Sequence, residues 1–402
     1  MTIEIVQVTD KAMLQRFIRV PFAVHEHDSA WVPPLMMERE EAFSPKTNPF
    51  LRRAEVCFWL ARRDGRDVGR ITAQIDPLAQ QGGDGRVGHF GCLSTENDPE
   101  AFAALLNTAE DFLRSRGAAH VQGPFSLSIN EETGLLVDGF DTPPMLLMPH
   151  DPAYMAARLE ARGYRKERDV YAYLLDMETP FSNSARKMLE RPLPGSITMR
   201  RMDFSDYSNE IRRIVDIYND AWSGNWGFVP LTEPEGEAMA KQMKMLLDKR
   251  LVWFAEADGR AVAFIVALPN INEAIRDLDG RLFPFGWAKL LWRLKWRGVR
   301  SARVPLFGVR RSLAGTLIGS ALPLQLIGSI LPANADFGFR WIELSWILED
   351  NLPMRRILER LGARPYKTYR VYGKALGSQS EALAAHTSST YSPIRLPTQA
   401  SV

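Results

Sequence analysis

A repeated stretch of sequence constrains the fold of this chain more than any other feature. Residues 59–73 read WLARRDGRDVGRITA and residues 253–267 read WFAEADGRAVAFIVA. Trp, Ala, Asp-Gly-Arg, Val, Ile and Ala therefore recur at one constant offset of 194 residues. An Asp-Gly pair between two strand-like runs is typical of a tight β-hairpin. Self-similarity at a fixed spacing indicates that one structural unit occurs twice.

A second match, further along the chain, supports the duplication. Residues 154–164 (YMAARLEARGY) resemble residues 353–363 (PMRRILERLGA) at an offset of 199. Each copy has the pattern of an amphipathic helix that ends at a glycine. A Tyr-rich strand is predicted after each helix, over 170–175 and 369–372. Two matches in the same order favour a duplicated domain over a chance similarity between hairpins.

The repeat sets the predicted domain boundaries. A length of 402 residues suits two domains. We expect an N-terminal domain over residues 1–178 and a C-terminal domain over residues 196–376. The Pro- and Ser-rich segment 179–195 is predicted to be the linker. Residues 377–402 are rich in Ser, Thr, Ala and Pro and poor in large apolar residues, which predicts a disordered tail.

The charge balance and the cysteine content exclude several classes of protein. The net charge is +2 and the pI about 8.5, whereas nucleic-acid binding usually needs a broad excess of positive charge. Cys57 and Cys92 are too few for a disulfide framework or a zinc site, and no HExxH, CxxC or P-loop motif occurs, so we expect no metal. His89 and His150 are expected to be structural. The first residues have no leader pattern, which predicts a cytoplasmic protein.

Between Asp279 and Asp336 the chain runs for 56 residues without an acidic side chain and carries nine Lys or Arg residues. It opens on the aromatic and basic segment 283–297, whose tryptophans are Trp287, Trp292 and Trp296. Tryptophan suits the headgroup depth of a bilayer, and Lys and Arg suit its phosphates. The segment therefore predicts contact with an anionic membrane surface or a lipid, and an ordinary packed helix is the alternative.

Residues 312–335 carry no charge. A transmembrane span needs about 20 predominantly apolar residues, but Pro323, Gln325 and several Ser and Gly residues interrupt this run. A buried helix, or the wall of a tunnel for a lipid tail, is predicted instead.

Each predicted unit runs strand, helices, a hairpin extended to a third strand, helix, strand, helix, strand. This order resembles the GCN5-related N-acetyltransferase (GNAT) fold over nearly all of the chain to about residue 376. The resemblance implies an α/β (α+β) protein with two tandem GNAT-like acyltransferase domains, each a mixed sheet flanked by helices. It also implies acyl-CoA as co-substrate, with the pyrophosphate on backbone N–H groups at a helix N-terminus.

The phosphate loop of that family, Gln/Arg-x-x-Gly-x-Gly/Ala, follows the fourth strand. The second unit has Val309 to Gly319 (VRRSLAGTLIG) in this place, where Gly319 fits the last small position. Leu317 stands where the middle glycine is expected, and Ala314 where the Gln or Arg is. The candidates for binding acyl-CoA are Phe307, Gly308, Val309, Arg310, Arg311, Gly315, Thr316 and Gly319, and a backbone N–H of the first three would polarise the thioester carbonyl. The first unit has the acidic residues 93–100 there, so chemistry is predicted in the C-terminal half.

Three residues of the second unit are candidates for catalysis. Glu343 lies in a predicted strand beside the thioester, where a carboxylate could take a proton from the amine. A salt bridge is the alternative for this residue. Asn351 matches an Asn at the start of the last helix of the family, but Leu358 stands where the usual general acid, a Tyr, is expected. The final strand offers Tyr369 and Tyr372, of which Tyr372 is the candidate acid for the leaving thiolate.

Residues 222–230 (WSGNWGFVP) and 346–351 (WILEDN), with 366–372 (YKTYRVY), resemble a bacterial subgroup of tandem GNAT-like proteins, the ceramide synthases. The resemblance implies N-acylation of a sphingoid-type amino lipid by a long-chain acyl thioester. Asn225 and Trp226 then become candidates for a substrate entrance, with a structural turn as the alternative.

The sequence therefore predicts an acyl-CoA-dependent N-acyltransferase that is cytoplasmic and peripheral on the inner face of the cytoplasmic membrane. A non-catalytic GNAT-like scaffold that binds lipid or protein is one alternative, supported by the altered phosphate loop and the missing tyrosine. A GNAT enzyme acting on a soluble amine or a tRNA-linked amino acid is another. The sequence does not determine the acyl chain length, the choice between CoA and acyl-carrier protein, or the oligomeric state.

Overall fold

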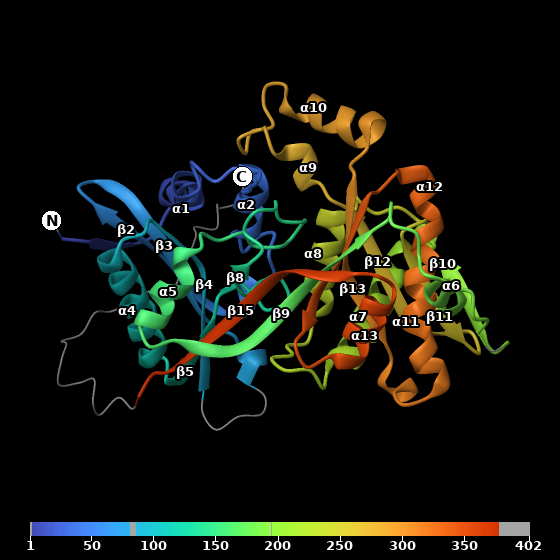
Figure 1. Cartoon of the computed structure of the whole chain (residues 1–402). Coiled ribbons are helices and arrows are strands. Elements are labelled where there is room, and N and C mark those ends of the chain that lie inside the picture. The colour runs from blue at the N-terminus through green and yellow to red at the C-terminus, as the bar shows by residue number, and fades with distance from the viewer. Residues whose placement is uncertain (1, 81–85, 194, 378–402) are drawn as a thin grey trace, which may run out of the picture.

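The structure is a computed structural model that describes residues 2–80, 86–193 and 195–377. The predicted tail, apart from Gly377, and one residue of the predicted linker lie outside the described residues. Figure 1 shows the course of the chain, with the N-terminal half in blue to green and the C-terminal half in yellow to red.

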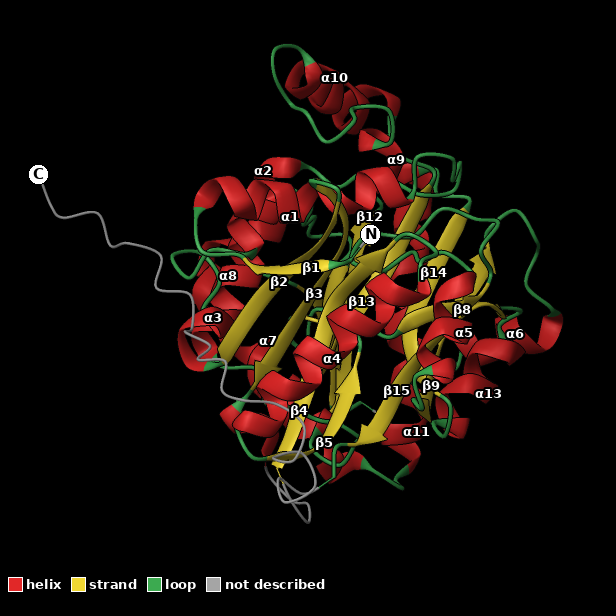
Figure 2. Ribbon diagram, turned by 90° about the vertical axis from the view of Figure 1, so that its left-hand side faces the viewer, coloured by secondary structure: helices red, strands yellow, loops and turns green. Residues whose placement is uncertain are grey.

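One mixed sheet of 13 strands runs through both halves of the molecule (Figures 1 and 2). Its order is β1-β2-β3-β4-β5-β15-β9-β14-β13-β12-β11-β10, and β8 pairs with β15. The strands of the N-terminal half are β1 (Glu4–Gln7), β2 (Glu55–Arg63), β3 (Arg66–Ile75), β4 (Arg86–Thr95), β5 (Ala118–Gly123), β8 (Leu135–Asp138) and β9 (Arg165–Asp176). Those of the C-terminal half are β10 (Ile197–Arg201), β11 (Val252–Ala257), β12 (Arg260–Pro269), β13 (Ser301–Val309), β14 (Trp341–Leu348) and β15 (Arg364–Ala375). A separate ribbon joins β6 (Phe125–Ser126) to β7 (Glu132–Thr133).

Both predicted hairpins are present, as β2–β3 and β11–β12. Each turns on an Asp-Gly pair in which both residues have positive φ: Asp64 at 51° with Gly65 at 80°, and Asp258 at 49° with Gly259 at 76°. This is the conformation of a type I′ turn, whose twist matches that of the flanking strands. The repeated Asp-Gly motif therefore marks equivalent hairpins.

The two halves exchange their last strands. β15, from the end of the C-terminal half, pairs with β5 of the N-terminal half, while β9 of the N-terminal half pairs with β14. β9 and β15 also pair antiparallel with each other at the centre of the sheet. The α/β architecture is as predicted, but the sequence predicted one sheet in each unit. The exchange joins the two sheets into one.

One pair of strands in each half is parallel, β4 with β5 and β13 with β14. In the N-terminal half, the segment after β5 turns back and fills the space where β4 and β5 part. A Cβ on Gly91 would lie 1.8 Å from the carbonyl oxygen of Phe125. The side chain of Gln74 donates to the carbonyls of Phe125 and Leu127 at 2.9 and 2.7 Å. The described β13–β14 ladder ends at the pair Val304–Leu344, beyond which those strands also part.

Helices cover both faces of the sheet in each half (Figure 2). Alternate residues of β2 face opposite ways, so Val56 and Phe58 pack with α1 whereas Cys57 and Trp59 pack with α4. In the C-terminal half α7 covers one face and α11 the other. The helices are α1 (Lys11–Val24), α2 (Met36–Ala42), α3 (Phe50–Arg53), α4 (Pro99–Ser115), α5 (Tyr154–Ala161), α6 (Asn183–Leu189), α7 (Tyr207–Trp222), α8 (Glu233–Met243), α9 (Asn272–Ile275), α10 (Gly286–Trp292), α11 (Leu317–Ile330), α12 (Asn334–Phe337) and α13 (Leu352–Arg360).

The predicted linker, residues 179–195, packs against the uncharged segment, residues 312–335, on the C-terminal half. The predicted linker contains α6, and Gln325 of α11 donates to the carbonyl of Leu189 at 3.1 Å. By length and composition, Leu317–Phe337 is one helical run apolar enough to cross a membrane, with a mean hydropathy of 1.3. Leu322 and Leu326 are fully buried against the core that includes β11 and β12. One side of this run is therefore core, but only 33% of its apolar window is buried and Leu317 is 85% exposed, so it is not the wholly buried helix predicted.

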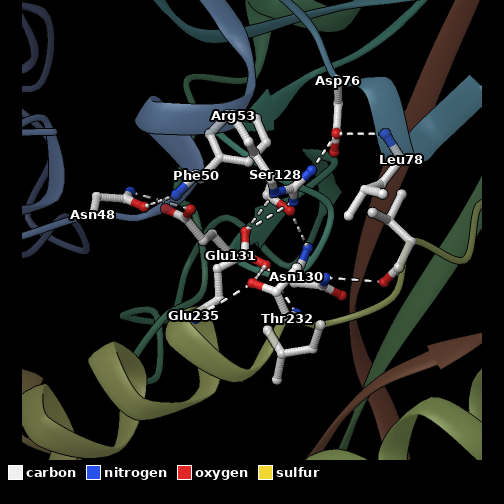
Figure 3. A network of polar contacts seen from close by, with 12 residues as sticks. Asn48, Phe50, Arg53, Asp76, Leu78, Ser128, Asn130, Glu131, Thr232 and Glu235 are labelled. Atoms are coloured by element: carbon white, nitrogen blue, oxygen red, sulfur yellow. Dashed lines mark hydrogen bonds and ion pairs between the residues drawn. The ribbon is translucent and has the colours of Figure 1, made fainter.

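Polar side chains join the two halves next to α8 (Figure 3). Arg53 donates to the carboxylate of Glu235 at 2.8 and 3.1 Å and is paired with Asp76 as well. Asn130 donates to the carbonyl of Val229 at 3.1 Å. Because a buried charge is stable only when it is paired and hydrogen-bonded, these contacts fix how the halves meet.

Candidate functional site

Some backbone N–H and carbonyl groups of β13 point into the gap between β13 and β14. Arg310 N–H donates to the carbonyl of Val262 on β12 at 2.8 Å. Because backbone groups alternate along an antiparallel strand, those of Phe307 and Val309 point away from β12, into the gap. The Phe307 carbonyl accepts from the indole N–H of Trp222 at 2.9 Å. The Val309 N–H and the Phe307 N–H are both directed at the gap.

The predicted phosphate loop begins the helix α11. A Cβ on Gly319 would lie 2.0 Å from the carbonyl oxygen of Leu313, so only glycine fits this position. Thr316 is the N-cap and accepts from Gly319 N–H at 3.0 Å. Gly315 has a φ of +75°. These three residues therefore fold the loop over the first turn of α11, at the surface.

The two arginines of this loop are held by the last turns of α7. Arg310 pairs with Asp216. The Arg311 N–H donates to the carboxylate of Asp220 at 2.7 Å, and its guanidinium donates to Ser223 Oγ at 2.9 Å. The structure thereby brings the predicted phosphate loop to the start of the predicted entrance segment. The two carboxylates offset part of the positive charge expected there.

The predicted entrance residues lie where the halves meet. Asn225 lines a cavity of about 260 Å³, together with His89 and Gln122 of the N-terminal half. Trp226 packs among apolar residues, and the guanidinium of Arg168 lies 5.5 Å from its ring centroid. Both residues therefore belong to the contact between the halves as well as to the loop that follows α7.

Glu343 is fully buried at the centre of a polar cluster. Its carboxylate accepts hydrogen bonds from Tyr366 and Ser345 and lies 3.4 Å from the Nε of Arg303. Arg303, also buried, donates to Ser345 Oγ at 2.8 Å and to the carbonyl of Leu146 at 2.8 Å. Burial, with the charge of Glu343, raises the pKa of the Tyr366 phenol, which keeps this hydroxyl protonated as a donor.

The other two catalytic candidates lie away from this cluster. The Asn351 side chain caps α13 by accepting from Met354 N–H at 3.3 Å. Tyr372 stands opposite Gly123 of β5, and its hydroxyl donates to Glu160 at 3.0 Å. Because β15 crosses into the N-terminal half, its end carries Tyr372 away from Glu343. The tyrosine whose hydroxyl contacts Glu343 is Tyr366, which sequence reasoning did not select.

A cavity of about 270 Å³ lies between the two halves. Its wall comes from α1 and the segment after it, from residues 144–151, and from α8 and α9. Leu146 and Met148 belong to this wall and contact Arg303 and Ser345 from the other side. The cavity therefore adjoins β13 and β14 at the level where those strands part.

A carboxylate joins two histidines in the wall of this central cavity. Asp28 Oδ2 lies 2.9 Å from Nε2 of His150 and 3.3 Å from Nδ1 of His25, and the His25 ring stacks on Trp31. Burial lowers the pKa of His25 to about 4 and also lowers the pKa of His150, so both rings are neutral at pH 7. Burial opposes ionisation of Asp28, but hydrogen bonds from Ala30 N–H and the imidazoles lower its pKa.

Two arginines line the same cavity in different ways. Arg39 is paired with Glu38 at 2.7 Å and with Glu132 at 2.9 Å. Arg70 has no carboxylate partner among the described residues. One of its Nη atoms donates to the carbonyl of Phe17 at 3.0 Å, and its Nε has no hydrogen-bond partner in the described part of the chain. Burial lowers the pKa of Arg70 to about 10.

Asp151 and Lys367, near the same cavity, also have shifted pKa values. Asp151 accepts from Leu136 N–H at 2.9 Å, and burial raises its pKa to about 7. Burial lowers the pKa of Lys367 to about 8, although its ammonium donates to the carbonyl of Thr142 at 2.7 Å. Groups that titrate near neutral pH therefore gather here, which is typical of functional sites.

Sequence reasoning missed this set of residues. The sequence predicts a structural role for His150 and gives no reason to place it beside Asp28, from which it is separated by 122 positions. The available signal is local: His25-Glu-His-Asp28 and His150-Asp151 each bring an imidazole and a carboxylate within a few residues. Only the packing of α1 against residues 144–151 joins the two motifs.

The three predicted membrane-facing tryptophans lie on a projection of the C-terminal half. In both views α10 stands off the rest of the molecule (Figures 1 and 2). Trp287, Trp292 and Trp296 are 49, 52 and 73% exposed, and Phe283 and Phe285 are 74 and 78% exposed. In an ordinary packed helix these aromatic side chains would be buried against the rest of the protein, whereas here they are exposed to solvent.

Among the described residues, no group of three or more His, Cys, Asp or Glu side chains is placed to hold a metal ion.

Comparison with known proteins relates the whole chain to one family, although no protein-family profile matches it. The chain is 50% identical over 375 residues to a protein of Caulobacter vibrioides named bacterial ceramide synthase, covering 93% of this chain and 98% of that protein. It is 45% identical over 368 residues to protein YghO of Escherichia coli, covering 91% and 94%.

Solved structures with the same fold are GNAT proteins. A tandem GNAT protein from the clavulanic acid biosynthesis pathway matches with a TM-score of 0.55 at 14% identity, covering 93% of this chain and 99% of that one. A GCN5-related N-acetyltransferase from Sphaerobacter thermophilus matches with a TM-score of 0.51 at 15% identity, covering 92% and 96%. The predicted GNAT fold is thereby confirmed. With the identity to the Caulobacter protein, it follows that the chain is an N-acyltransferase and belongs to the bacterial ceramide synthase family.

Proposed function

We propose that the protein transfers a long-chain acyl group from acyl-CoA to the amine of a sphingoid-type amino lipid. The observation that carries this proposal is the 50% identity to a bacterial ceramide synthase, which extends over 98% of that protein. A relationship of this extent includes both halves and the surfaces between them. The soluble-amine and scaffold alternatives remain outcomes of the first experiment below.

The acyl-CoA is placed in the C-terminal half, in the gap between β13 and β14. The corresponding gap of the N-terminal half is filled by Phe125 and its neighbours. The pyrophosphate would lie at the N-terminus of α11, where Thr316 and Gly319 shape the first turn and unsatisfied N–H groups attract anions. Arg310 and Arg311 stand beside it. The thioester carbonyl would then accept from Val309 N–H.

The reaction requires a proton acceptor for the ammonium and a proton donor for the leaving thiolate. Glu343 is the acceptor that the sequence predicts, but Arg303, Ser345 and Tyr366 already occupy its carboxylate. For the donor, the contact with Glu343 favours Tyr366 over Tyr372. Asn351 supports the region by capping α13.

Purified protein, a long-chain acyl-CoA and sphinganine are expected to give the N-acyl product and free CoA thiol in equal amounts. Mass spectrometry of the lipid and a thiol reagent measure the two products. Acyl-acyl-carrier protein in place of acyl-CoA distinguishes the donors. Acylation of soluble amines or an aminoacyl-tRNA, but not of sphinganine, would favour the soluble-acceptor alternative. If no amine is acylated and no CoA ester raises the unfolding temperature, the result favours the non-catalytic scaffold.

The α10 projection is proposed to bring the protein to the anionic inner face of the cytoplasmic membrane. Arg281, Lys295 and Arg297 add exposed positive charge to its aromatic side chains. Lys289 and Arg293 are instead paired with Asp277. Exposed tryptophans beside exposed basic groups suit the headgroup layer, where amino lipids present their amines.

Replacing Trp287, Trp292 and Trp296 together by Ser is expected to weaken binding to anionic vesicles by roughly 1,000-fold or more, because each buried aromatic contributes roughly 1.5–3 kcal/mol and about 1.4 kcal/mol corresponds to tenfold. Vesicle flotation measures binding, and added salt should weaken it for the unmodified protein. Phe204→Ser, an exposed aromatic elsewhere on the C-terminal half, is the matched control and should bind normally. If the triple variant and the control float equally well, α10 is not the part of the protein that contacts the membrane.

A further inference from the structure

The central cavity contains acid–base groups to which neither the predicted site nor any relative's name assigns a role. We propose that it binds the amine-bearing head of the acceptor and that His150 takes the ammonium proton. This inference rests on the proposed N-acylation, since it names the acceptor side of the same reaction. It places half of the active site in the N-terminal half of the chain.

The geometry of His150 carries the first step. Its Nε2 faces Asp28 at 2.9 Å, so the N–H lies on this nitrogen and donates to the carboxylate. Nδ1 then carries the lone pair, and this buried atom has no hydrogen-bond partner in the described part of the chain. Because a buried nitrogen without a partner is costly, it is suited to a donor that arrives with the substrate. Asp28 orients the ring, as a carboxylate does for a basic histidine.

The remaining groups of the cavity fit an amino alcohol. Asp151 offers a carboxylate to the ammonium beside His150. Arg70 offers the unpartnered Nε described above, which can donate to a hydroxyl oxygen. A sphingoid base carries an amine between hydroxyl-bearing carbons, so its head presents both functions within a few ångströms. The cavity of about 270 Å³ is large enough for such a head but not for a long chain.

The position of the cavity links it to the acyl group. Arg303 of β13 donates to the carbonyls of Leu146 and Leu147 at 2.8 and 3.3 Å, and Ser345 of β14 lies 3.6 Å from the sulfur of Met148. Residues 146–148 therefore border both the cavity and the strands near their parting point. An amine held in the cavity approaches the gap from the side opposite α11.

Protons and bonds balance for this assignment. The ammonium gives one proton to His150 Nδ1, which makes an imidazolium beside Asp28. The free amine attacks the thioester carbonyl, a C–N bond forms and the C–S bond breaks. The second proton lost from nitrogen passes to the leaving thiolate and gives the CoA thiol. His150 then releases its proton to water, so one proton is released in each turnover.

The charged surroundings of His150 determine its pH dependence. The titratable groups that face it are Asp28 and His25 from the segment after α1, Lys367 from β15, and Asp151 from its own segment. Burial lowers the pKa of His150. The base is therefore neutral at pH 7, and kcat should fall only as the pH drops below its ordinary value of about 6.5. Protonation of Asp151, whose pKa burial raises to about 7, should instead raise the KM for the amine.

The test is a pH profile of acylation from about pH 5 to about pH 8, with acyl-CoA and sphinganine. His150→Gln is expected to lower kcat roughly 100-fold and to remove the acidic limb, with the KM for acyl-CoA unchanged. His27→Gln replaces an exposed histidine of the same segment as Asp28 and should behave as the unmodified protein. An unchanged kcat for His150→Gln, or loss of the acidic limb in Glu343→Gln instead, would overturn the proposal.

Binding of a short-chain 2-amino-1,3-diol, measured by calorimetry without acyl-CoA, separates this proposal from the proposed function. Arg70→Met should weaken that binding about tenfold while its unfolding midpoint and CoA binding stay normal. If the unmodified protein binds the diol but acylates no sphingoid base, the proposed function fails and the cavity assignment stands. If it acylates sphinganine and Arg70→Met binds the diol normally, the cavity assignment fails. Tighter binding of serine than of the diol would assign Arg70 to a carboxylate and overturn the amino-alcohol assignment.

Discussion

Residues 1–195 and 196–402, produced separately, are each expected to fail to fold, whereas the two fragments produced together should form one soluble, active complex. Alone, the N-terminal fragment has no strand beside β5, and the C-terminal fragment has none beside β14, because β15 and β9 occupy these places. Tyr369, Val371 and Tyr372 of β15 are fully buried and would lose their surroundings. Unpaired sheet edges of this length also promote aggregation.

Size-exclusion chromatography and circular dichroism of each fragment, alone and co-produced, measure this outcome. The co-produced pair is the control, because it carries the same chain break with every strand in place. A fragment that alone shows a cooperative unfolding transition would mean that its half is stable without the exchange. Restored acylation in the pair would show that the break itself does no harm to the site.

The repeat determines most of the fold that could be predicted, because a hairpin and its turn are local. Asp64-Gly65 and Asp258-Gly259 have the residue types that positive φ favours, so the sequence marks both hairpins directly. The Tyr-rich strands were likewise predictable as β9 and β15. Their exchange was not, because these two strands echo each other in sequence. The sequence of these strands therefore does not indicate which of them completes which half.

The candidate site likewise contains residues that could be predicted from local sequence and residues that could not. Gly319 was predictable from a pattern because the carbonyl of Leu313 passes so close that no Cβ fits. The choice of tyrosine on β15 was not, because the register of this strand shifts between Pro365 and Lys367 and between Val371 and Tyr372. Each shift changes which side chains face one side of the sheet. Alternation in the sequence alone therefore cannot show that Tyr366, and not Tyr372, meets Glu343.

The central cavity lay furthest from prediction because it has no local pattern. Asp28 follows α1, His150 lies in an irregular segment, and Arg70 is on β3. Each is an isolated polar residue until the layers close around it. Their common property, burial with incomplete pairing, exists only in the folded molecule.

Arg303→Met is expected to lower the free energy of unfolding by about 3–5 kcal/mol, because it leaves the buried carboxylate of Glu343 without its countercharge. Arg303 and Glu343 are 3% and 0% exposed, so water cannot replace the lost partner. Hydrogen bonds from Tyr366 and Ser345 remain but do not neutralise the charge. Denaturant unfolding of Arg303→Met, Glu343→Gln and the double variant measures the effect as a cycle.

The double variant should recover much of the loss, because a neutral amide no longer needs the guanidinium. A loss below about 1 kcal/mol would mean that the pair acts like an exposed salt bridge. In that case the wall between β13, β14 and the central cavity would be open to water, and Glu343 would be accessible as a base. A large loss that the double variant reverses would instead assign Glu343 mainly to holding the wall, and leave proton transfer to the cavity side.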